Sequence, residues 1–526
     1  MRSGQNHLNP PSRPSLAHKS DCPSTKLYEK PLNAMSQAHG LEPTKKETTF
    51  THPLLYETTS PDALVDFDGQ EDPYRPVNWP FRKKATTTIL YGMTTCWITF
   101  ASAIYSAGLQ QIAHEFGVST EVSTAGISLL VFGLGLGPLI WAPLSEIYGR
   151  KIVAIVPYFI AGIFSFGTAT AKDIQTLLIT RFFSGFFGSS SVAITGGAMA
   201  DIWKPEHRGV AIVVYSLTLV GGPCLGPIIG GALTSSYLRW RWTEYLTGIM
   251  MMAQFVLDLF LLEESYAPAL LVRKARQLRL EGNNWALHAK HEEWDVSISE
   301  MSQKYLIRPF QTLGTPIGLL MSSYGAFVYA ILYVNLESFA IEFQEIRGWG
   351  PVTGSLPFIA LLIGICLAAL FNVYNNQYYF KKLRENNGKP VPEARLPPMM
   401  VGGLVFTGGL FLFGWTSSPT INYWPSLIGI AFTGFGFTTI FQSSMNYLVD
   451  TFLRFSASAI AATTLLRSIL AGAFPLFVKP MIRNIGVDWG ITVFGCIAAV
   501  LIPVPFLFFA WGRRIRAKSR WSSHSV

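Results

Sequence analysis

The chain has little charge for its length. Of its 526 residues, 14% are Asp, Glu, Lys or Arg, whereas soluble domains carry about a quarter. Hydrophobic residues make up 49% of the chain. A soluble protein of this size divides into several domains with polar surfaces, and these charges are too few to cover them. The shortage of charge therefore predicts a membrane protein.

Cysteine and the motifs of soluble enzymes are scarce as well. The five cysteines have neither disulfide nor metal spacing. They are Cys22, Cys96, Cys224, Cys366 and Cys496. The sequence has no glycine loop ending in Lys-Ser or Lys-Thr, so ATP is not the evident energy source. It also has no Gly-x-Ser-x-Gly elbow and no His/Cys cluster. We therefore expect no enzyme activity, no metal site and no cofactor.

The chain instead has long apolar runs of about 20 residues, the length that crosses a bilayer as a helix. The first six runs lie near residues 86–107, 124–144, 152–171, 177–200, 209–233 and 244–263. After a polar stretch, six more lie near residues 313–336, 352–376, 398–417, 422–445, 456–479 and 489–511. The pattern predicts an all-α integral membrane fold with twelve transmembrane helices, divided six and six.

The stretches between the runs predict the domain organisation. Residues 1–85 are rich in Pro, Ser, Thr and Lys and lack periodicity, so we expect a disordered cytoplasmic tail. The domains expected after it are a first six-helix bundle (86–264), a cytoplasmic linker (265–311), a second six-helix bundle (312–511) and a basic cytoplasmic tail (512–526).

Positive charge is unevenly divided between the two sides of this plan. The linkers and the carboxyl tail on the side of the amino terminus carry 22 Lys and Arg residues, and the opposite loops carry six. Because Lys and Arg accumulate in cytoplasmic loops, both termini and the central linker are expected in the cytoplasm.

The connection between the second and third runs, Ala142–Lys151, is a candidate gating loop. It places an acid, Glu146, a turn glycine, Gly149, and two cations, Arg150 and Lys151, in a very short hinge. Such a tight hinge brings Glu146 to Arg150 and Lys151 at the membrane surface. A charge pair made in one state and broken in the other biases a conformational equilibrium. The alternative is that both cations are only topology anchors.

Ionisable residues inside the runs are candidates for proton coupling, because a charge within the bilayer needs a partner or a wet cavity. They are Arg181 at the start of the fourth run, Asp258 in the sixth and Arg467 in the eleventh. Arg181 could instead snorkel to the outer interface. Asp258, like Glu337 and Glu342 in the seventh run, could instead be an interfacial group that reaches water.

The fifth run combines regularly spaced glycines with two prolines. Gly222, Gly226 and Gly230 recur every four residues and form one smooth stripe, which a neighbouring helix can approach closely. Pro223 and Pro227 each remove a backbone donor and bend the helix. A bent helix with a smooth face suits a gating role, and the alternative is close packing without motion.

Polar and aromatic side chains in other runs are candidates for a substrate cavity that stacks a flat or cationic ligand. They are Tyr105, Gln254, Tyr324, Tyr329, Asn335, Asn372, Tyr374, Gln442, Asn446 and Tyr447. Most aromatic residues in such a chain face lipid or core, so we expect fewer than half of these to line the cavity.

Several motifs resemble the major facilitator superfamily, in particular its fungal twelve-helix drug:proton antiporters. Ala142–Lys151 is similar to the family's loop motif, with Glu146 where many members have Asp. Arg181–Gly188 resembles the fourth-helix motif, whose Arg the family links to proton transfer. Gly222–Gly231 resembles the fifth-helix antiporter motif, which is the sharpest pointer to efflux.

Shorter matches, from about residue 70 to the end, are similar to the fungal polyamine and multidrug exporter subgroup. These are Asp72-Pro73 with Asn78-Trp79, Trp240-Arg241-Trp242, Glu264-Ser265-Tyr266-Ala267-Pro268, Arg308-Pro309-Phe310-Gln311 and Phe474-Pro475-Leu476-Phe477. One departure is the linker after the eighth run, because Asn375–Arg384 does not repeat the Gly-Arg-Lys form of the first hinge.

The resemblance implies two pseudo-symmetric six-helix bundles around a midplane site that opens alternately to each side. It implies export of a drug, toxic secondary metabolite or polyamine by proton antiport, driven by the proton gradient. Glu146, Arg150 and Lys151 would latch the cytoplasmic side, and Arg181 would serve coupling. One alternative is a proton-coupled uptake symporter for a nutrient or polyamine. Another is a non-transporting membrane sensor.

The expected partners are a small-molecule substrate, protons and the lipid bilayer, with the chain acting as a monomer. Its basic residues are dispersed among loops and form no folded basic face, which argues against a nucleic-acid partner. The expected location is the plasma membrane, with the vacuolar membrane as the alternative.

Overall fold

The computed structural model describes residues 64–293, 303, 307–387 and 389–518. By its internal contacts the chain divides into two units, Met1–Thr58 and Thr59–Val526. The first unit, and with it most of the predicted amino-terminal tail, lies outside the described residues, as do residues 519–526. The elements that follow all belong to the second unit.

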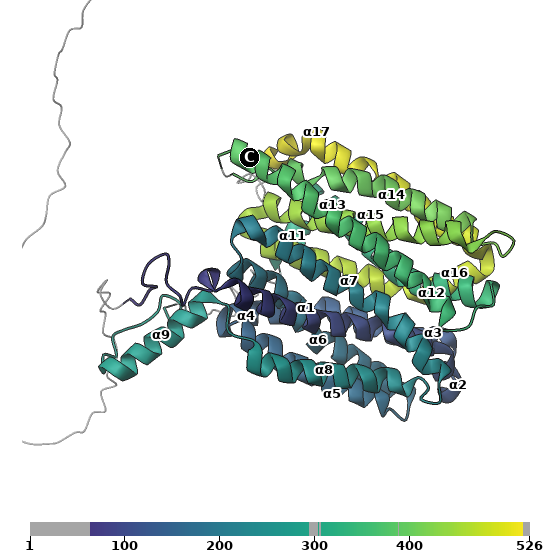
Figure 1. Cartoon of the computed structure of the whole chain (residues 1–526), viewed down its shortest axis with the longest axis horizontal. Coiled ribbons are helices and arrows are strands. Elements are labelled where there is room, and N and C mark those ends of the chain that lie inside the picture. Colours follow the sequence, from purple (N-terminus) through teal and green to yellow (C-terminus); the bar gives the residue numbers. More distant parts are fainter. Residues whose placement is uncertain (1–63, 294–302, 304–306, 388, 519–526) are drawn as a thin grey trace, which may run out of the picture. The chain divides into compact units, whose positions relative to one another are not determined.

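The described part of the chain is helical, with an isolated β-bridge between Leu64 and His288. Long helices run side by side in the first half of the molecule, and short turns of helix lie at their ends (Figure 1). In chain order these are η2 (Pro76–Asn78), α1 (Phe81–Ile104), η3 (Tyr105–Gly108), α2 (Leu109–Phe116), α3 (Thr120–Leu136), α4 (Pro138–Tyr148), α5 (Arg150–Ala169), α6 (Ile174–Ile202), α7 (Pro205–Ser235) and α8 (Arg241–Leu261).

The second half repeats this arrangement after a surface helix, α9 (Ala267–Gly282). Its elements are α11 (Arg308–Leu313), α12 (Pro316–Phe339), the π-helix η5 (Ala340–Ile346), η6 (Thr353–Ser355), α13 (Pro357–Glu385), η7 (Pro392–Arg395), α14 (Pro397–Trp415), α15 (Tyr423–Phe452), η8 (Leu453–Phe455), α16 (Ser456–Leu501) and α17 (Pro503–Lys518).

The predicted all-α membrane fold with twelve crossings is confirmed. Ten described helices are long and apolar enough to cross a membrane. The last of these, Ser458–Ala517, has 60 residues and counts as two crossings because the chain turns at Gly486, where φ is +86°. The remaining crossing is α1, which is rich in threonine and begins with Arg82, Lys83 and Lys84.

Some of the helices begin at a residue whose side chain caps their first free N–H groups. Asp173 accepts a hydrogen bond from the N–H of Thr176 at the start of α6. Thr315 accepts from the N–H of Gly318 in the same way at the start of α12. Each of these caps directly precedes an apolar run, so α6 and α12 begin within about three residues of the predicted runs. Other ends differ more, as in α13, which continues to Glu385 beyond the predicted end at 376.

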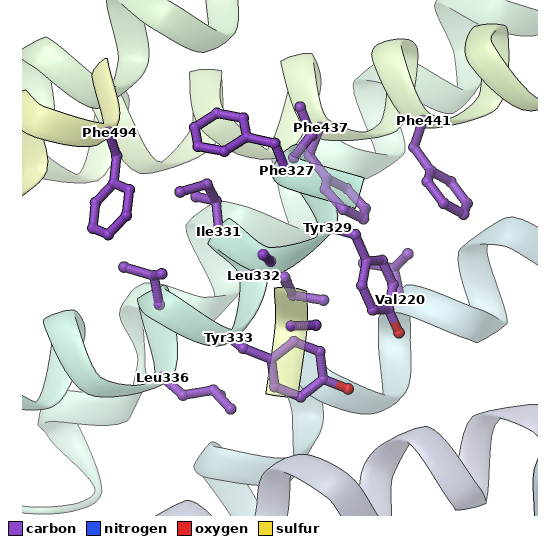
Figure 2. Packing of buried hydrophobic residues seen from close by; sticks show 14 of the residues in the cluster. Val220, Phe327, Tyr329, Ile331, Leu332, Tyr333, Leu336, Phe437, Phe441 and Phe494 are labelled. Atoms are coloured by element: carbon purple, nitrogen blue, oxygen red, sulfur yellow. The ribbon is translucent and has the colours of Figure 1, made fainter. Parts of the chain in front are cut away.

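One helix, α12, lies in the middle of the protein. Of its membrane window, 83% is buried inside the protein, against 33–61% for the other nine apolar spans. Figure 2 shows its residues Tyr329 and Tyr333 beside Phe437 and Phe441 of α15 and Val220 of α7. Since α7 belongs to the first six helices and α12 and α15 to the second, this aromatic core joins the two halves.

The segment before α1 folds against α9. The carboxylate of Asp72 accepts hydrogen bonds from the N–H groups of Asp68 and Tyr74, which hold the pKa of Asp72 below its ordinary value. Nδ2 of Asn78 donates to the carbonyl oxygens of Gln70 and Asp72. Lys274 of α9 lies 3.7 Å from the Asp72 carboxylate. The Asp72 and Asn78 motif therefore folds the turn that leads into the first crossing.

Candidate functional site

In the predicted gating loop, Arg150 forms an ion pair with Asp201, which lies outside the loop. We call this pair the first latch. Nε of Arg150 donates to Oδ2 of Asp201, at the end of α6, over 3.1 Å. Nη1 of Arg150 donates to the hydroxyl of Ser145 over 2.7 Å. The guanidinium lies 4.9 Å from the centre of the Tyr266 ring. Arg150 thus ties the start of α5 to the ends of α4 and α6.

A second acid, Glu264, closes the start of α5. Its carboxylate accepts hydrogen bonds from the N–H groups of Arg150 (2.8 Å) and Lys151 (3.1 Å), and it is 3% exposed. A carboxylate at a helix N-terminus is favoured by the free N–H groups and by the helix dipole. Gly149 has φ of +93°, and a Cβ atom there would lie 2.5 Å from Oε2 of Glu264. This position in the hinge therefore requires glycine.

The second half carries an equivalent latch, although Asn375–Arg384 lacks the motif. Nε of Arg395 donates to Oδ2 of Asp450 over 3.0 Å. Its Nη1 donates to Oδ1 of Asn376 over 3.0 Å, and its guanidinium lies 3.3 Å from the centre of the Tyr379 ring. In each half an arginine at the start of one helix pairs with an aspartate at the end of the next. We call the membrane face that holds both latches the latch face.

The second latch also touches the first half of the protein. The start of α7 passes so close to α13 that a Cβ atom at Gly209 would overlap the side-chain amide of Asn376. Asn376 therefore accepts a hydrogen bond from Arg395 and at the same time packs against the other six-helix half. At the latch face, the second latch therefore lies beside a contact between the two halves.

Arg181, a predicted coupling residue, is turned into the first bundle. Its Nη1 lies 3.1 Å from Oε1 of Glu244 in α8, and both side chains are 1% exposed. Nη1 also donates to the carbonyl oxygen of Ala101, and Nε donates to that of Gly126. The guanidinium lies 4.3 Å from the centre of the Tyr105 ring. This buried ion pair joins α1, α3, α6 and α8.

Glu244 is a functional candidate that the sequence analysis missed. It is the first residue of the predicted sixth run, 244–263, and the sequence analysis gives it no role. The signal that could have identified it is an acid in the first turn of a membrane helix, because α8 begins at Arg241. Its partner is 63 residues away in the sequence, so no local pattern links the two.

Asp258, the second predicted coupling residue, is buried in the same bundle near the latch face. Its carboxyl group accepts a hydrogen bond from Nε2 of Gln254 over 2.8 Å, and no described cation forms an ion pair with it. Oγ1 of Thr94 lies 2.9 Å from Oδ2 of Asp258 and 2.7 Å from the carbonyl oxygen of Leu90. A hydroxyl has one proton to donate. Thr94 donates that proton either to the carboxyl of Asp258 or to the carbonyl oxygen of Leu90.

Arg467, the third predicted coupling residue, lies between the halves among aromatic rings. Its guanidinium is 4.6 Å from the centre of the Tyr329 ring and 5.5 Å from that of Phe441. The side chain is 5% exposed, and its Nε has no hydrogen-bond partner in the described part of the chain. Phe437 and Phe441 stack with their planes 5° apart (Figure 2). Arg467 and Tyr329 are thus predicted residues that the fold brings together.

Several other predicted cavity residues have hydrogen-bond partners of their own. Tyr105 lies under Arg181 and donates to the carbonyl oxygen of Ser123, while Gln254 binds Asp258. Gln442 accepts a hydrogen bond from Asn372 over 2.8 Å. Asn335 is buried in α12 and Asn446 is half-buried in α15. The hydroxyls of Ser102 and Tyr333 lie 3.0 Å apart and join α1 to α12 near the aromatic core.

The glycine stripe of α7 packs against α1. A Cβ atom at Gly222 would lie 2.5 Å from the carbonyl oxygen of Cys96. A Cβ atom at Gly226 or Gly230 would lie 2.7 Å from a backbone atom of Ile104. Both helices belong to the first half, so the stripe lets two helices of one bundle touch. The gating role of the stripe and of Pro223 and Pro227 stays a prediction.

The described residues contain no group of three or more His, Cys, Asp or Glu side chains that could hold a metal ion. What the described residues offer chemically is a set of buried charges, two of them in a tight ion pair. Two salt-bridge latches on one face and an aromatic core between the halves complete the arrangement.

Comparisons with known proteins agree with this geometry. A model of the Major Facilitator Superfamily matches residues 91–475. The efflux pump bik6 of Gibberella fujikuroi is 61% identical over 88% of this chain and 96% of its own length. The citrinin biosynthesis cluster MFS transporter mrr1 of Monascus ruber is 42% identical over 87% of this chain and 92% of its own. The solved structure of the proton:xylose symporter XylE, bound to 6-bromo-6-deoxy-D-glucose, shares the fold at 14% identity with a TM-score of 0.58 over 82% of this chain and 96% of that chain.

Proposed function

The chain belongs to the Major Facilitator Superfamily, and we propose that it couples export to protons through the Arg181–Glu244 pair. It is a multi-pass membrane transporter that exports small molecules, and it is not an enzyme. The proton gradient is the driving force, so protons move inward while substrate moves outward, and no cofactor takes part.

The observation that carries this proposal is the buried ion pair itself. Both charges lie inside the bundle, where the low dielectric makes their attraction strong and their separation costly. A proton on Glu244 would neutralise the acid and leave Arg181 with only the carbonyl oxygens of Ala101 and Gly126 and the Tyr105 ring. Because Arg181 joins four helices, protonation would loosen their packing and bias the bundle toward a second arrangement.

The position of the acids along α8 supports a direction for the proton. Glu244 lies in the first turn of α8, at the face opposite the latches, and Asp258 lies near the other end. The 14 residues between them span roughly 20 Å of helix. Protons would reach Glu244 from outside and leave near Asp258.

The latches would control access from the cytoplasm. The latch face is cytoplasmic in this proposal, since the loops on that side carry most of the Lys and Arg residues. Releasing Arg395 from Asp450 would free Asn376 from its bond to Arg395 and weaken the contact with the start of α7. Opening of this contact would admit substrate from the cytoplasm.

The substrate would lie against the aromatic core at Arg467, Tyr329 and Phe441. Flat rings stack there, and a fixed cation at the centre disfavours polyamines, which carry several positive charges. The relative from a citrinin biosynthesis cluster supports a secondary metabolite as substrate. The chain would act as a monomer in the plasma membrane with both termini cytoplasmic, and the vacuolar membrane is the alternative location.

Glu244→Gln tests the coupling, because the amide resembles a permanently protonated acid. In reconstituted vesicles, the variant should exchange labelled substrate across the membrane and should not accumulate it under an imposed pH gradient. Retained exchange shows that the variant is folded and binds substrate. Glu121→Gln, a change at an exposed acid of α3, is the matched control and should behave as wild type. Gradient-driven accumulation by Glu244→Gln at the wild-type rate would exclude Glu244 as the coupling site.

A further inference from the structure

We propose that a cavity near the face opposite the latches is a second substrate site, which takes a neutral, hydroxyl-bearing molecule with an apolar body. The cavity has a volume of about 340 Å³, in the range of small-molecule sites. Its walls include Leu109 of α2 and Pro227 of α7 from the first half. Leu336 of α12, Phe358 of α13 and Lys479 of α16 come from the second half. A molecule in this cavity would therefore touch both halves on its way out.

One wall of the cavity holds a buried acid and a buried cation that do not satisfy each other. Glu337 is 3% exposed and Lys479 is 8% exposed. Oε2 of Glu337 lies 3.9 Å from Nζ of Lys479, too far for a hydrogen bond. Oε1 of Glu337 has no hydrogen-bond partner among the described residues. A buried polar atom without a partner is costly, so the pair is a site that a ligand would complete.

The two charges together select the chemistry of the ligand. An ammonium group would be attracted by Glu337 and repelled by Lys479. A carboxylate would be attracted by Lys479 and repelled by Glu337. A hydroxyl donates one hydrogen bond and accepts others, so it can donate to Glu337 and accept from Lys479 at once. The pair therefore favours a neutral phenol or alcohol over either ion.

The rest of the cavity defines the body of the ligand. Leu109, Leu336, Ile341 and Phe358 give part of its wall an apolar surface, beside polar side chains such as Gln111 and Gln344. The apolar part favours a ring system attached to the hydroxyl. A second acid, Glu345, also lines the cavity, but its carboxylate accepts a hydrogen bond from Arg483 over 2.9 Å. The selecting charges are thus Glu337 and Lys479.

A matched set of probes on one ring system tests this assignment: 1-naphthol, 1-naphthylmethylammonium and 1-naphthoate. Binding is measured at equilibrium with the purified full chain in detergent. We expect 1-naphthol to bind more tightly than either ion. Glu337→Gln and Lys479→Gln should each weaken 1-naphthol binding about tenfold, the loss expected for a hydrogen bond to a charged group. Glu281→Gln, a change at an exposed acid of α9 outside the cavity, should leave the affinity unchanged.

Two outcomes would overturn the proposal. If the ammonium probe binds best and depends on Glu337, the cavity is a cation site. If neither Glu337→Gln nor Lys479→Gln changes 1-naphthol binding, the cavity is not a ligand site. Because each variant is tested alone, failure of one to fold leaves the other as the test. Only the role of this site in export depends on the proposed function. Binding needs no proton gradient, so failure of the proton coupling would appear in flux and not in this assay.

Discussion

Arg395 and Asp450 meet at 3.0 Å in the second half of the transporter, as Arg150 and Asp201 meet at 3.1 Å in the first. The same atoms, Nε and Oδ2, form both pairs. The hinge motif is present in the first half and absent from the corresponding stretch of the second. The two bundles therefore conserve an electrostatic arrangement that their local sequences do not share.

The second latch should be as necessary for transport as the first. Because the pair is largely buried, Asp450→Asn leaves Arg395 uncompensated, and we expect export to fall about tenfold. Arg395→Asp combined with Asp450→Arg should recover part of the flux, measured in vesicles. Lys382→Gln breaks an exposed pair with Glu385 and serves as the control, with flux within about twofold of wild type. Full flux in Asp450→Asn would contradict a gating role for this latch.

Gly149→Ala should destabilise the protein by more than the backbone strain of a positive φ alone would cause. The substitution places a side chain at φ of +93° and against Oε2 of Glu264. Gly117→Ala is the matched control, since Gly117 also has positive φ (+63°) and has open space around it. We expect Gly149→Ala to lower the melting temperature clearly more than Gly117→Ala, which carries only the strain of about 1–3 kcal/mol. An equal fall in melting temperature for both variants would show that the contact with Glu264 does not contribute to the destabilisation.

The glycine stripe offers a test on a single helix. Gly226→Ala places a methyl group 2.7 Å from the backbone nitrogen of Ile104, so α7 and α1 must separate. Gly221 lies outside the stripe on the same helix, and a Cβ atom there would have no neighbouring atom within 4 Å. Gly221→Ala is therefore the control. Flux should fall several-fold in the first variant and stay near wild type in the second. Normal flux in Gly226→Ala would show that transport tolerates a wider spacing of these helices.

Asp258→Asn should be nearly neutral for stability, because Oγ1 of Thr94 can donate to Leu90 and accept from the amide that replaces the carboxyl. We expect its melting temperature to stay within about 2 °C of wild type. Glu244→Gln should lower the melting temperature by about 5 °C or more, since it leaves Arg181 buried without a counter-charge. A large loss in Asp258→Asn would indicate that Asp258 is ionised in the folded protein.

The course of the helices could be predicted from the sequence because it follows from local composition. Each apolar run of bilayer length became a helix, and the threonine-rich run 86–107 did so despite its polarity, as α1. The start of α1 at Phe81, earlier than predicted, follows Pro80, whose fixed backbone suits a helix start. Local signals of this kind do not depend on the tertiary structure.

The pairings within the site could not be predicted, because they join residues far apart in the chain. The sequence marks Arg181 as a candidate coupling residue, but the acid that pairs with it lies in another helix. Gln254 was assigned to a substrate cavity, and the fold instead turns it toward Asp258. A polar residue in a membrane helix signals that it has a partner, and only the packing of the helices shows which one.

The most direct test of the central claim is substrate-induced proton movement by the wild-type protein. Vesicles with a trapped pH indicator and no imposed gradient would receive 1-naphthol or the cationic dye rhodamine 6G on the outside. Proton antiport predicts that inward movement of a substrate drives protons out and raises the internal pH, and that Glu244→Gln abolishes this change. A fall of the internal pH would mean that protons move with the substrate, and substrate movement without any pH change would contradict proton coupling.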